Sequence, residues 1–289
     1  LQTQKKWSSI NTMDPAYDQY EKAREFYRTH EYLAWIGEDE SDEETIRSAS
    51  EEALDQSENA NSPANTDSAS AKISDQPMIY PMQQLMDYDF LMKHFYNVHT
   101  STTADRELMN AKNLLSKDLT LEKEDAPQIL IYHTHSQESY KNSKKDENVV
   151  AVGQKLTDLL TEKGWNVYHD TTVYDLAVGK LDRSRAYTYA LEGINEILAR
   201  YPSIQVVLDI HRDGVGEDVY LKTEIGGQPS ARIMFFNGLS QTPEGPISYL
   251  ANPFREDNLA FSLKLQLKAE EYYPGFTRKI YLKGLRYNQ

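Results

Sequence analysis

Two short motifs end apolar runs with histidine and carboxylate side chains. The first, "ILIYHTHSQES", carries His133, His135 and Glu138, and the second, "VLDIHRDG", carries His211, Arg212 and Asp213. Both apolar runs are predicted to be strands. Functional side chains of α/β sheets gather just beyond the carboxyl ends of strands, so the two motifs are candidates for one site.

Two imidazoles and a carboxylate are ligands that suit zinc, and neighbouring parallel strands would bring the two motifs together. Zinc lowers the pKa of a bound water from about 15.7 to about 7, so this pattern is typical of hydrolytic zinc sites. His133 and His135 are expected to point to the same side. One of them is expected to bind the metal, and the other to have an orienting role or to bind substrate. Glu138 is the preferred carboxylate ligand, with Glu147 as the alternative.

The second motif leaves roles open. Asp209 or Asp213 is expected to orient an imidazole from behind. Arg212 and Asp213 either contact substrate or form an ion pair that only stabilises the loop. A serine of "SQES" acting with His211 and Asp213 is a distant alternative, because the chain has no Gly-x-Ser-x-Gly motif.

The elements that must position these residues alternate along the chain, which predicts an α/β fold with a largely parallel central sheet flanked by helices. Apolar runs predict strands at 129–132, 165–169, 204–210, 231–237 and 278–282. Apolar spacing predicts helices at 103–119, 146–163, 187–200 and 258–273. In the helix over 146–163, which Gly164 is expected to end, the predicted apolar stripe is Val149, Val152, Leu156, Leu159 and Leu160.

Charge and composition suggest how the chain is organised. Of the formal net charge of −14 over 289 residues, −10 lies between Glu38 and Asp75, so the remainder lacks the basic face of a nucleic-acid-binding protein. The absence of cysteine excludes disulfides and thiolate nucleophiles. The predicted units are an N-terminal helical segment (1–37, with a helix over 15–36), an acidic disordered linker (38–76), a helical segment packing on the catalytic domain (77–127) and the catalytic domain (128–289).

Together with "VGQKL…LLTEKGWNVYHD" between them, the two motifs strongly resemble the stage II sporulation protein P family. These are zinc-dependent cell-wall hydrolases of endospore-forming bacteria, related to the N-acetylmuramoyl-L-alanine amidases. The stretch "DYDFLMKHFYNV" is also similar to the segment that precedes the catalytic domain in clostridial members. The resemblance covers residues 78–289.

The resemblance implies an amidase-like fold and cleavage of peptidoglycan at the amide between N-acetylmuramic acid and L-alanine, with peptide cross-links as further targets. It places His135 and His211 at the zinc-ligand positions and leaves Glu138 preferred over Glu147. The family's general base is a glutamate on a further strand, followed by a final helix. We therefore expect the further strand, the final helix and the general base to lie beyond Gln289. The activity of residues 1–289 alone is expected to be impaired.

The resemblance also implies partners and a location. A lytic transglycosylase, stage II sporulation protein D, and membrane-anchoring sporulation proteins are the expected partners. The expected location is extracytoplasmic, at the engulfing mother-cell membrane, with an anchor in a segment that precedes Leu1. The alternatives are a non-catalytic peptidoglycan-binding or partner-docking fragment and a different zinc peptidase.

Overall fold

A three-stranded parallel sheet carries both histidine motifs. The computed structural model describes residues 71–72, 78–141, 143–144, 146–177, 180–215 and 219–285. In this sheet β3 (Ile129–Tyr132) lies between β4 (Val167–His169) and β7 (Val206–Asp209). All four residues of β3 are buried, as a continuous apolar run predicts for a strand covered on both faces. The predicted strands at these three places are confirmed.

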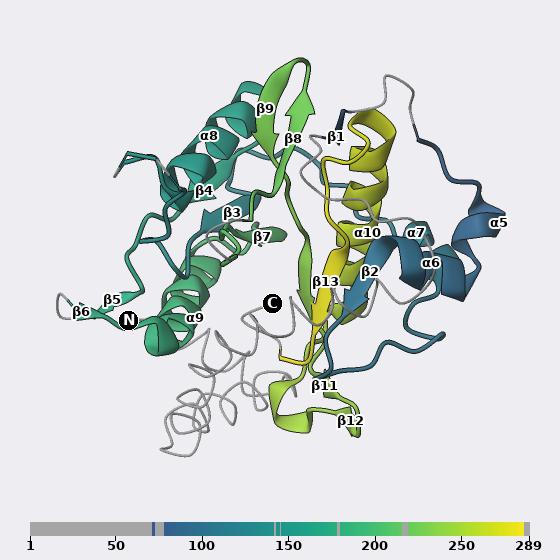
Figure 1. Cartoon of the computed structure of the whole chain (residues 1–289). Helices are drawn as coiled ribbons and strands as arrows, with labels where there is room; N and C mark the ends of the chain where they lie inside the picture. The colour runs from purple at the N-terminus through teal and green to yellow at the C-terminus, as the bar shows by residue number, and fades with distance from the viewer. Residues whose placement is uncertain are drawn as a thin grey trace.

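Two helices flank this sheet (Figure 1). On one face, Leu130 and Tyr132 pack against α9 (Arg183–Arg200). The intervening side chains of β3 point to the other face, where α8 (Val149–Glu162) contacts β3 and β4. Side chains cap both helices, because Asn148 accepts from the Ala151 N–H and Asp182 accepts from the Arg185 N–H.

The predicted helix over 146–163 forms, but its stripe is partly wrong. Val152 and Leu159 are 43% and 42% exposed, whereas Val149 and Gly153 are buried. Gly153 lacks a side chain and lies against the imidazoles of His133 and His169, so the helix turns this small residue inward. Gly164 ends the helix region with a φ of 81°, as its position predicts.

A second parallel sheet has the order β10 (Phe236–Gly238), β13 (Ile280–Lys283) and β2 (Tyr96–Val98). Helix α10 (Arg255–Tyr272) covers it and contacts α7 (Ala111–Ser116). The neighbouring helices are α5 (Met82–Leu85) and α6 (Tyr88–Phe95). One core joins buried residues of both ends of the described chain, such as Leu91, Phe95, Leu263 and Ile280. The 77–127 segment thus contributes a strand as well as helices.

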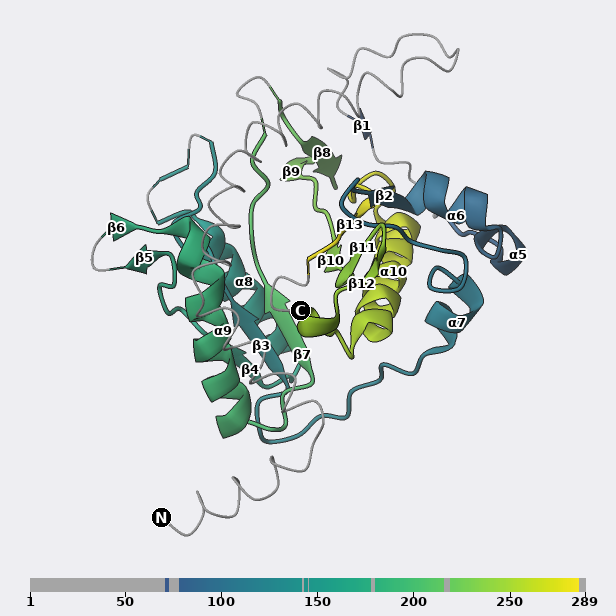
Figure 2. The same ribbon diagram turned by 90° about the horizontal axis from the view of Figure 1, so that it is seen from below.

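The α/β class is confirmed, but the parallel strands divide between two sheets where one largely parallel central sheet was predicted. Figures 1 and 2 show the β3 sheet with α8 and α9 in one half of the molecule and the β13 sheet with α10 in the other. Within the described residues, β3 pairs only with β4 and β7, and β13 only with β10 and β2. In the described part of the chain, no hydrogen-bonded strand therefore joins the two halves.

Two other predictions were too long. The helix expected over 103–119 is reduced to α7, because Asp105 accepts from the N–H groups of Glu107 and Leu108 and Asn110 caps a new helix start. The strand expected over 231–237 is reduced to β10 and a single bridge from Ile233 to Thr277.

Short elements complete the described chain. In a third sheet, β8 (Lys222–Ile225) pairs with β1 (Ala71–Lys72) and, through a hairpin, with β9 (Gln228–Ala231). Gly226 and Gly227 both have positive φ, as the turn of such a hairpin requires. The remaining elements are β5 (Leu176–Ala177), β6 (Lys180–Leu181), β11 (Gln241–Thr242), β12 (Gly245–Pro246) and the 3-10 helix η2 (Ser248–Leu250).

The predicted helix over 15–36 lies outside the described residues, as does the acidic linker apart from β1. Among the described helices, none combines the length and apolar character that a membrane crossing requires.

Candidate metal centre

The loops after β3 and β7 meet at the carboxyl edge of the first sheet. The two strands are parallel neighbours, with Tyr132 paired to Asp209, so the residues that follow them emerge side by side. The chain runs from β3 to β4 on one side and then returns across β3 to β7. Such a reversal point opens a crevice at the strand ends of α/β sheets.

Three predicted ligands come together at this edge of the sheet. The ring centroids of His135 and His211 are 5.3 Å apart, with the rings at 79°. The Nδ1 of His211 is 3.7 Å from Oε2 of Glu138. His135 and Glu138 are only 7% and 5% exposed, while the His211 side chain is 30% exposed. The cluster thus has one face open to solvent.

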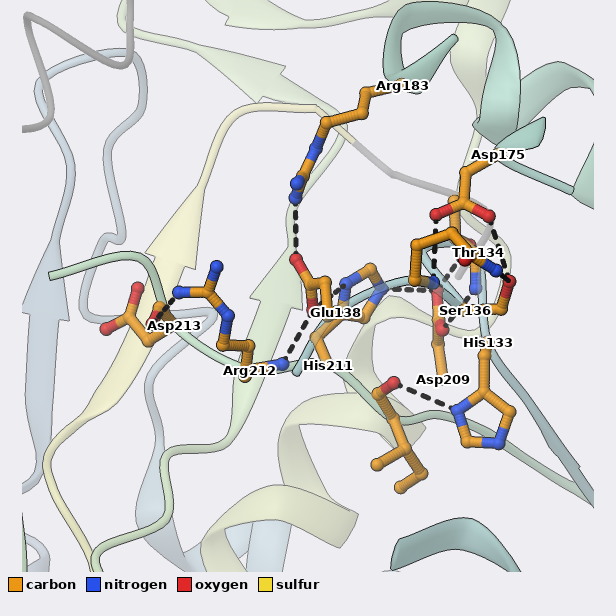
Figure 3. Close-up of polar contacts among 12 residues, drawn as sticks. His133, Thr134, Ser136, Glu138, Asp175, Arg183, Asp209, His211, Arg212 and Asp213 are labelled. Atoms are coloured by element: carbon orange, nitrogen blue, oxygen red, sulfur yellow. Dashed lines mark hydrogen bonds and ion pairs between the residues drawn. The ribbon is translucent and has the colours of Figure 1, made fainter. Parts of the chain in front are cut away.

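Asp209 fixes the orientation of His211. Its Oδ2 lies 2.7 Å from Nε2 of His211 and also accepts from the Thr134 hydroxyl, while Oδ1 accepts from the Thr134 N–H (Figure 3). Burial alone would raise the pKa of Asp209, but His211 and Thr134 hold that pKa below its ordinary value. Burial would likewise lower the pKa of His211, and the Asp209 carboxylate outweighs this and raises it. The hydrogen bond places a proton on Nε2 and turns Nδ1 towards Glu138.

Glu138 is held by two donors, one for each oxygen. The guanidinium of Arg183 lies 2.7 Å from Oε1, and the backbone N–H of Arg212 donates to Oε2 at 2.8 Å. Figure 3 shows Arg183 reaching the carboxylate from α9 while the Arg212 backbone approaches from the β7 loop. A carboxylate this buried is costly without such partners.

His135 is the least satisfied member of the cluster. Its Nδ1 is buried and has no hydrogen-bond partner among the residues that the structure describes. The Tyr187 ring packs edge-on against the His135 ring, with centroids 5.1 Å apart. The centroid of Tyr187 is also 6.3 Å from that of His211. Burial, together with the positive charges of His211 and Arg183, lowers the pKa of His135 to about 4. A neutral imidazole with an unused nitrogen is the form that binds a metal ion.

His133 does not point to the same side as His135, so that prediction is wrong. Its Nε2 lies 3.0 Å from Nε2 of His169, and its Nδ1 lies 3.2 Å from the carbonyl oxygen of Ile210. Burial lowers the pKa of His133. The alternation of side chains holds only within a strand, and β3 ends at Tyr132, so the chain turns before His135.

The remaining predicted residues lie around the cluster. Asp213 pairs with Arg278 at 2.5 Å, while the Arg212 guanidinium donates to the carbonyl oxygen of Asp213. Of the two roles left open for these residues, an ion pair with each other is replaced by the pair between Asp213 and Arg278, which ties the loop to the second half of the molecule. Glu147 pairs locally with Lys144 and is 55% exposed. The Ser136 hydroxyl donates its proton to Asp175. It is therefore not hydrogen-bonded to a histidine, as a serine nucleophile would require.

Two residues of α9 at the site are not predicted by the sequence motifs. Arg183 and Tyr187 lie one helical turn apart at the start of α9 and reach Glu138 and His135. Neither belongs to a motif. Their spacing of four residues at a helix start is the one available signal, and it is common on ordinary helix faces.

The imidazole and carboxylate groups are of the types that bind zinc, but they are not arranged as a complete set of metal ligands. Over the described ranges, no three His, Cys, Asp or Glu side chains are arranged as a metal site. Two observations nevertheless favour one: the unpartnered Nδ1 of His135 and the approach of His211 Nδ1 to Glu138 Oε2. Two ligand atoms of a tetrahedral zinc lie about 3.3 to 3.6 Å apart, close to that separation.

Sequence comparison decides the family. The family described as stage II sporulation protein P matches residues 9–289. The chain belongs to this family. It is 27% identical over 173 residues to "Stage II sporulation protein P" of Bacillus subtilis (strain 168). That alignment covers 55% of this chain but only 40% of the relative, so less than half of the relative is spanned. No solved structure matches the chain significantly.

Proposed function

We propose that this member of a sporulation protein family is a zinc-dependent peptidoglycan hydrolase that cleaves the amide between N-acetylmuramic acid and L-alanine. The observation that carries the proposal is the meeting of His135, Glu138 and His211 at one strand edge, with Asp209 behind His211. Two imidazoles and a carboxylate leave a fourth position of zinc open, as hydrolytic sites require.

The residues divide the work of holding the metal. His135 would bind through its unpartnered Nδ1, and His211 through the Nδ1 that faces Glu138. Asp209 keeps the proton of His211 on Nε2, so that Nδ1 retains its lone pair. When bound, zinc would supply a Lewis acid that polarises the scissile carbonyl and lowers the pKa of water to about 7.

The surroundings limit how substrate can approach. His135 and Glu138 are buried, whereas the His211 side chain is partly exposed, so substrate would enter from the His211 side. Tyr187 packs against both imidazoles and covers their α9 side. Within this proposal the protein acts outside the cytoplasm on the cell wall, and a lytic transglycosylase is its expected partner.

Product analysis of digested peptidoglycan tests the proposal. Purified sacculi are incubated with zinc-loaded protein, and soluble products are identified by mass spectrometry. An amidase releases stem peptides with a free N-terminal L-alanine and leaves glycan strands without peptides. The H211A variant is the control for carried-over activity.

Each other product points to a different function. Cleaved cross-links on peptides still attached to glycan indicate an endopeptidase, and loss of terminal D-alanine alone indicates a carboxypeptidase. Sedimentation of the protein with sacculi, without bound zinc and without release beyond the H211A control, would contradict the proposal and support a binding module.

A further inference from the structure

The carboxylate of Glu138 is held asymmetrically. Arg183 bonds to Oε1 at 2.7 Å, while Oε2 faces His211 Nδ1 at 3.7 Å and accepts the Arg212 N–H at 2.8 Å. Each carboxylate oxygen has two lone pairs. Oε2 therefore keeps one acceptor site directed towards the imidazole even while Arg183 occupies the other oxygen.

Arg183 lies outside both histidine motifs and reaches the site from a different element. It is the first residue of α9, whose N-cap Asp182 fixes the helix start. Its side chain is 43% exposed, while Glu138 is 5% exposed. The guanidinium thus bridges solvent and a buried carboxylate, and it lies 2.7 Å from Oε1 of Glu138.

We propose that Arg183 is a positioning residue for the metal centre: by holding Oε1 of Glu138, it keeps Oε2 aimed at the place between Glu138 and His211. The inference rests on the proposed zinc site. A carboxylate without this bond could rotate about its terminal torsion, which is broad and poorly fixed by rotamer preference. Partners of this kind typically contribute a factor of 10 to 100 in metal affinity.

A rival role for Arg183 predicts the opposite sign. If the guanidinium competed with zinc for Glu138, its removal would release the carboxylate and raise zinc affinity. The position of the bond argues against competition, because Arg183 occupies the oxygen that does not face His211. Repulsion between the guanidinium and a metal ion is weakened by the exposure of Arg183 to solvent.

Zinc affinity of four proteins, measured by competition with a chromophoric chelator, tests the proposal. R183A should bind zinc about 10 to 100-fold more weakly than the unsubstituted chain, and R183K should recover part of the loss through its single ammonium donor. R185A is the matched control, because Arg185 lies in the same helical turn and pairs with Asp182 instead. We expect R185A to remain within about twofold of the unsubstituted chain, as an exposed pair contributes little.

A double-mutant cycle with E138Q shows whether Arg183 acts through Glu138. In the E138Q background, the loss caused by R183A should largely disappear. Thermal unfolding of the metal-free proteins separates this role from a purely structural one, which would lower the unfolding temperature and leave zinc affinity unchanged. Unchanged or increased affinity in folded R183A overturns the inference. Absence of zinc binding by the unsubstituted chain overturns the proposed function itself.

Discussion

Replacing Asp209 with asparagine tests the orientation of His211 with little change in shape. In the folded protein the Asp209 carboxylate accepts three hydrogen bonds, two from Thr134 and one from Nε2 of His211. Asparagine has one acceptor oxygen and a donor amide in the same volume. Because the Thr134 N–H can only donate, it will retain the oxygen, and the amide will face His211.

A donor opposite Nε2 favours the other tautomer of His211. The proton then moves to Nδ1, the atom that faces Glu138, and blocks the nitrogen that we assign to zinc. We expect zinc affinity to fall about 10 to 100-fold, or roughly 1.4 to 2.7 kcal/mol. Exchange of charged for neutral hydrogen bonds should also lower the free energy of unfolding by about 1 to 2 kcal/mol.

Chelator competition measures the affinity of D209N, and thermal unfolding of the metal-free protein measures its stability. D170N is the matched control, because Asp170 is a buried aspartate after the neighbouring strand β4, and its donors among the described residues are Thr172 and Tyr174, not a histidine. D170N should lose stability and keep its zinc affinity. Equal zinc affinities for folded D209N and the unsubstituted chain would refute the assigned orientation of His211.

Three more outcomes are expected. An added Cβ at Gly153 would lie 2.5 Å from His133 Nε2, so G153A should lower the free energy of unfolding by about 1 to 3 kcal/mol. G214A is the control and should not lower it, because a Cβ there meets nothing within 4 Å. Equal unfolding temperatures for the two variants would contradict this packing. H133A should retain more zinc than H135A, and the reverse order by elemental analysis would exchange their roles. In metal-free protein the lowered pKa of His135, about 4, means that the unfolded chain binds a proton first as the pH falls below about 6.5. The His135 contribution to unfolding free energy should therefore drop by about 2 kcal/mol between pH 7 and pH 5. Urea titration should show a smaller drop for H135Q, and parallel pH curves would argue against a buried neutral imidazole.

The sequence was sufficient to locate the sheet that carries the site. The run at 129–132 and its neighbours are apolar enough to be read as buried parallel strands, and Gly164 marks a helix end through its backbone freedom. These features depend on local composition and on burial from both faces. The division of the strands between two sheets depends on which edges pair at long range, which no local pattern encodes.

The site itself was only partly predictable. The motifs bring His135, Glu138 and His211 together because they follow adjacent parallel strands. The direction of the His133 side chain depends on a turn that begins where β3 ends. The alternation of side chains along a strand therefore predicted wrongly that His133 points to the same side as His135. Arg183 reaches Glu138 from 45 residues further along the chain through the placement of α9, which only the packed fold defines.

Zinc stoichiometry shows whether His135, Glu138 and His211 form a metal centre. The purified chain, loaded with excess zinc and passed through a desalting column, is assayed by elemental analysis beside H135A and H211A. We expect about one zinc per chain for the unsubstituted protein and almost none for either variant, with all three folded by circular dichroism. Absence of zinc in the folded unsubstituted chain, or full retention in both variants, would contradict the proposed metal centre.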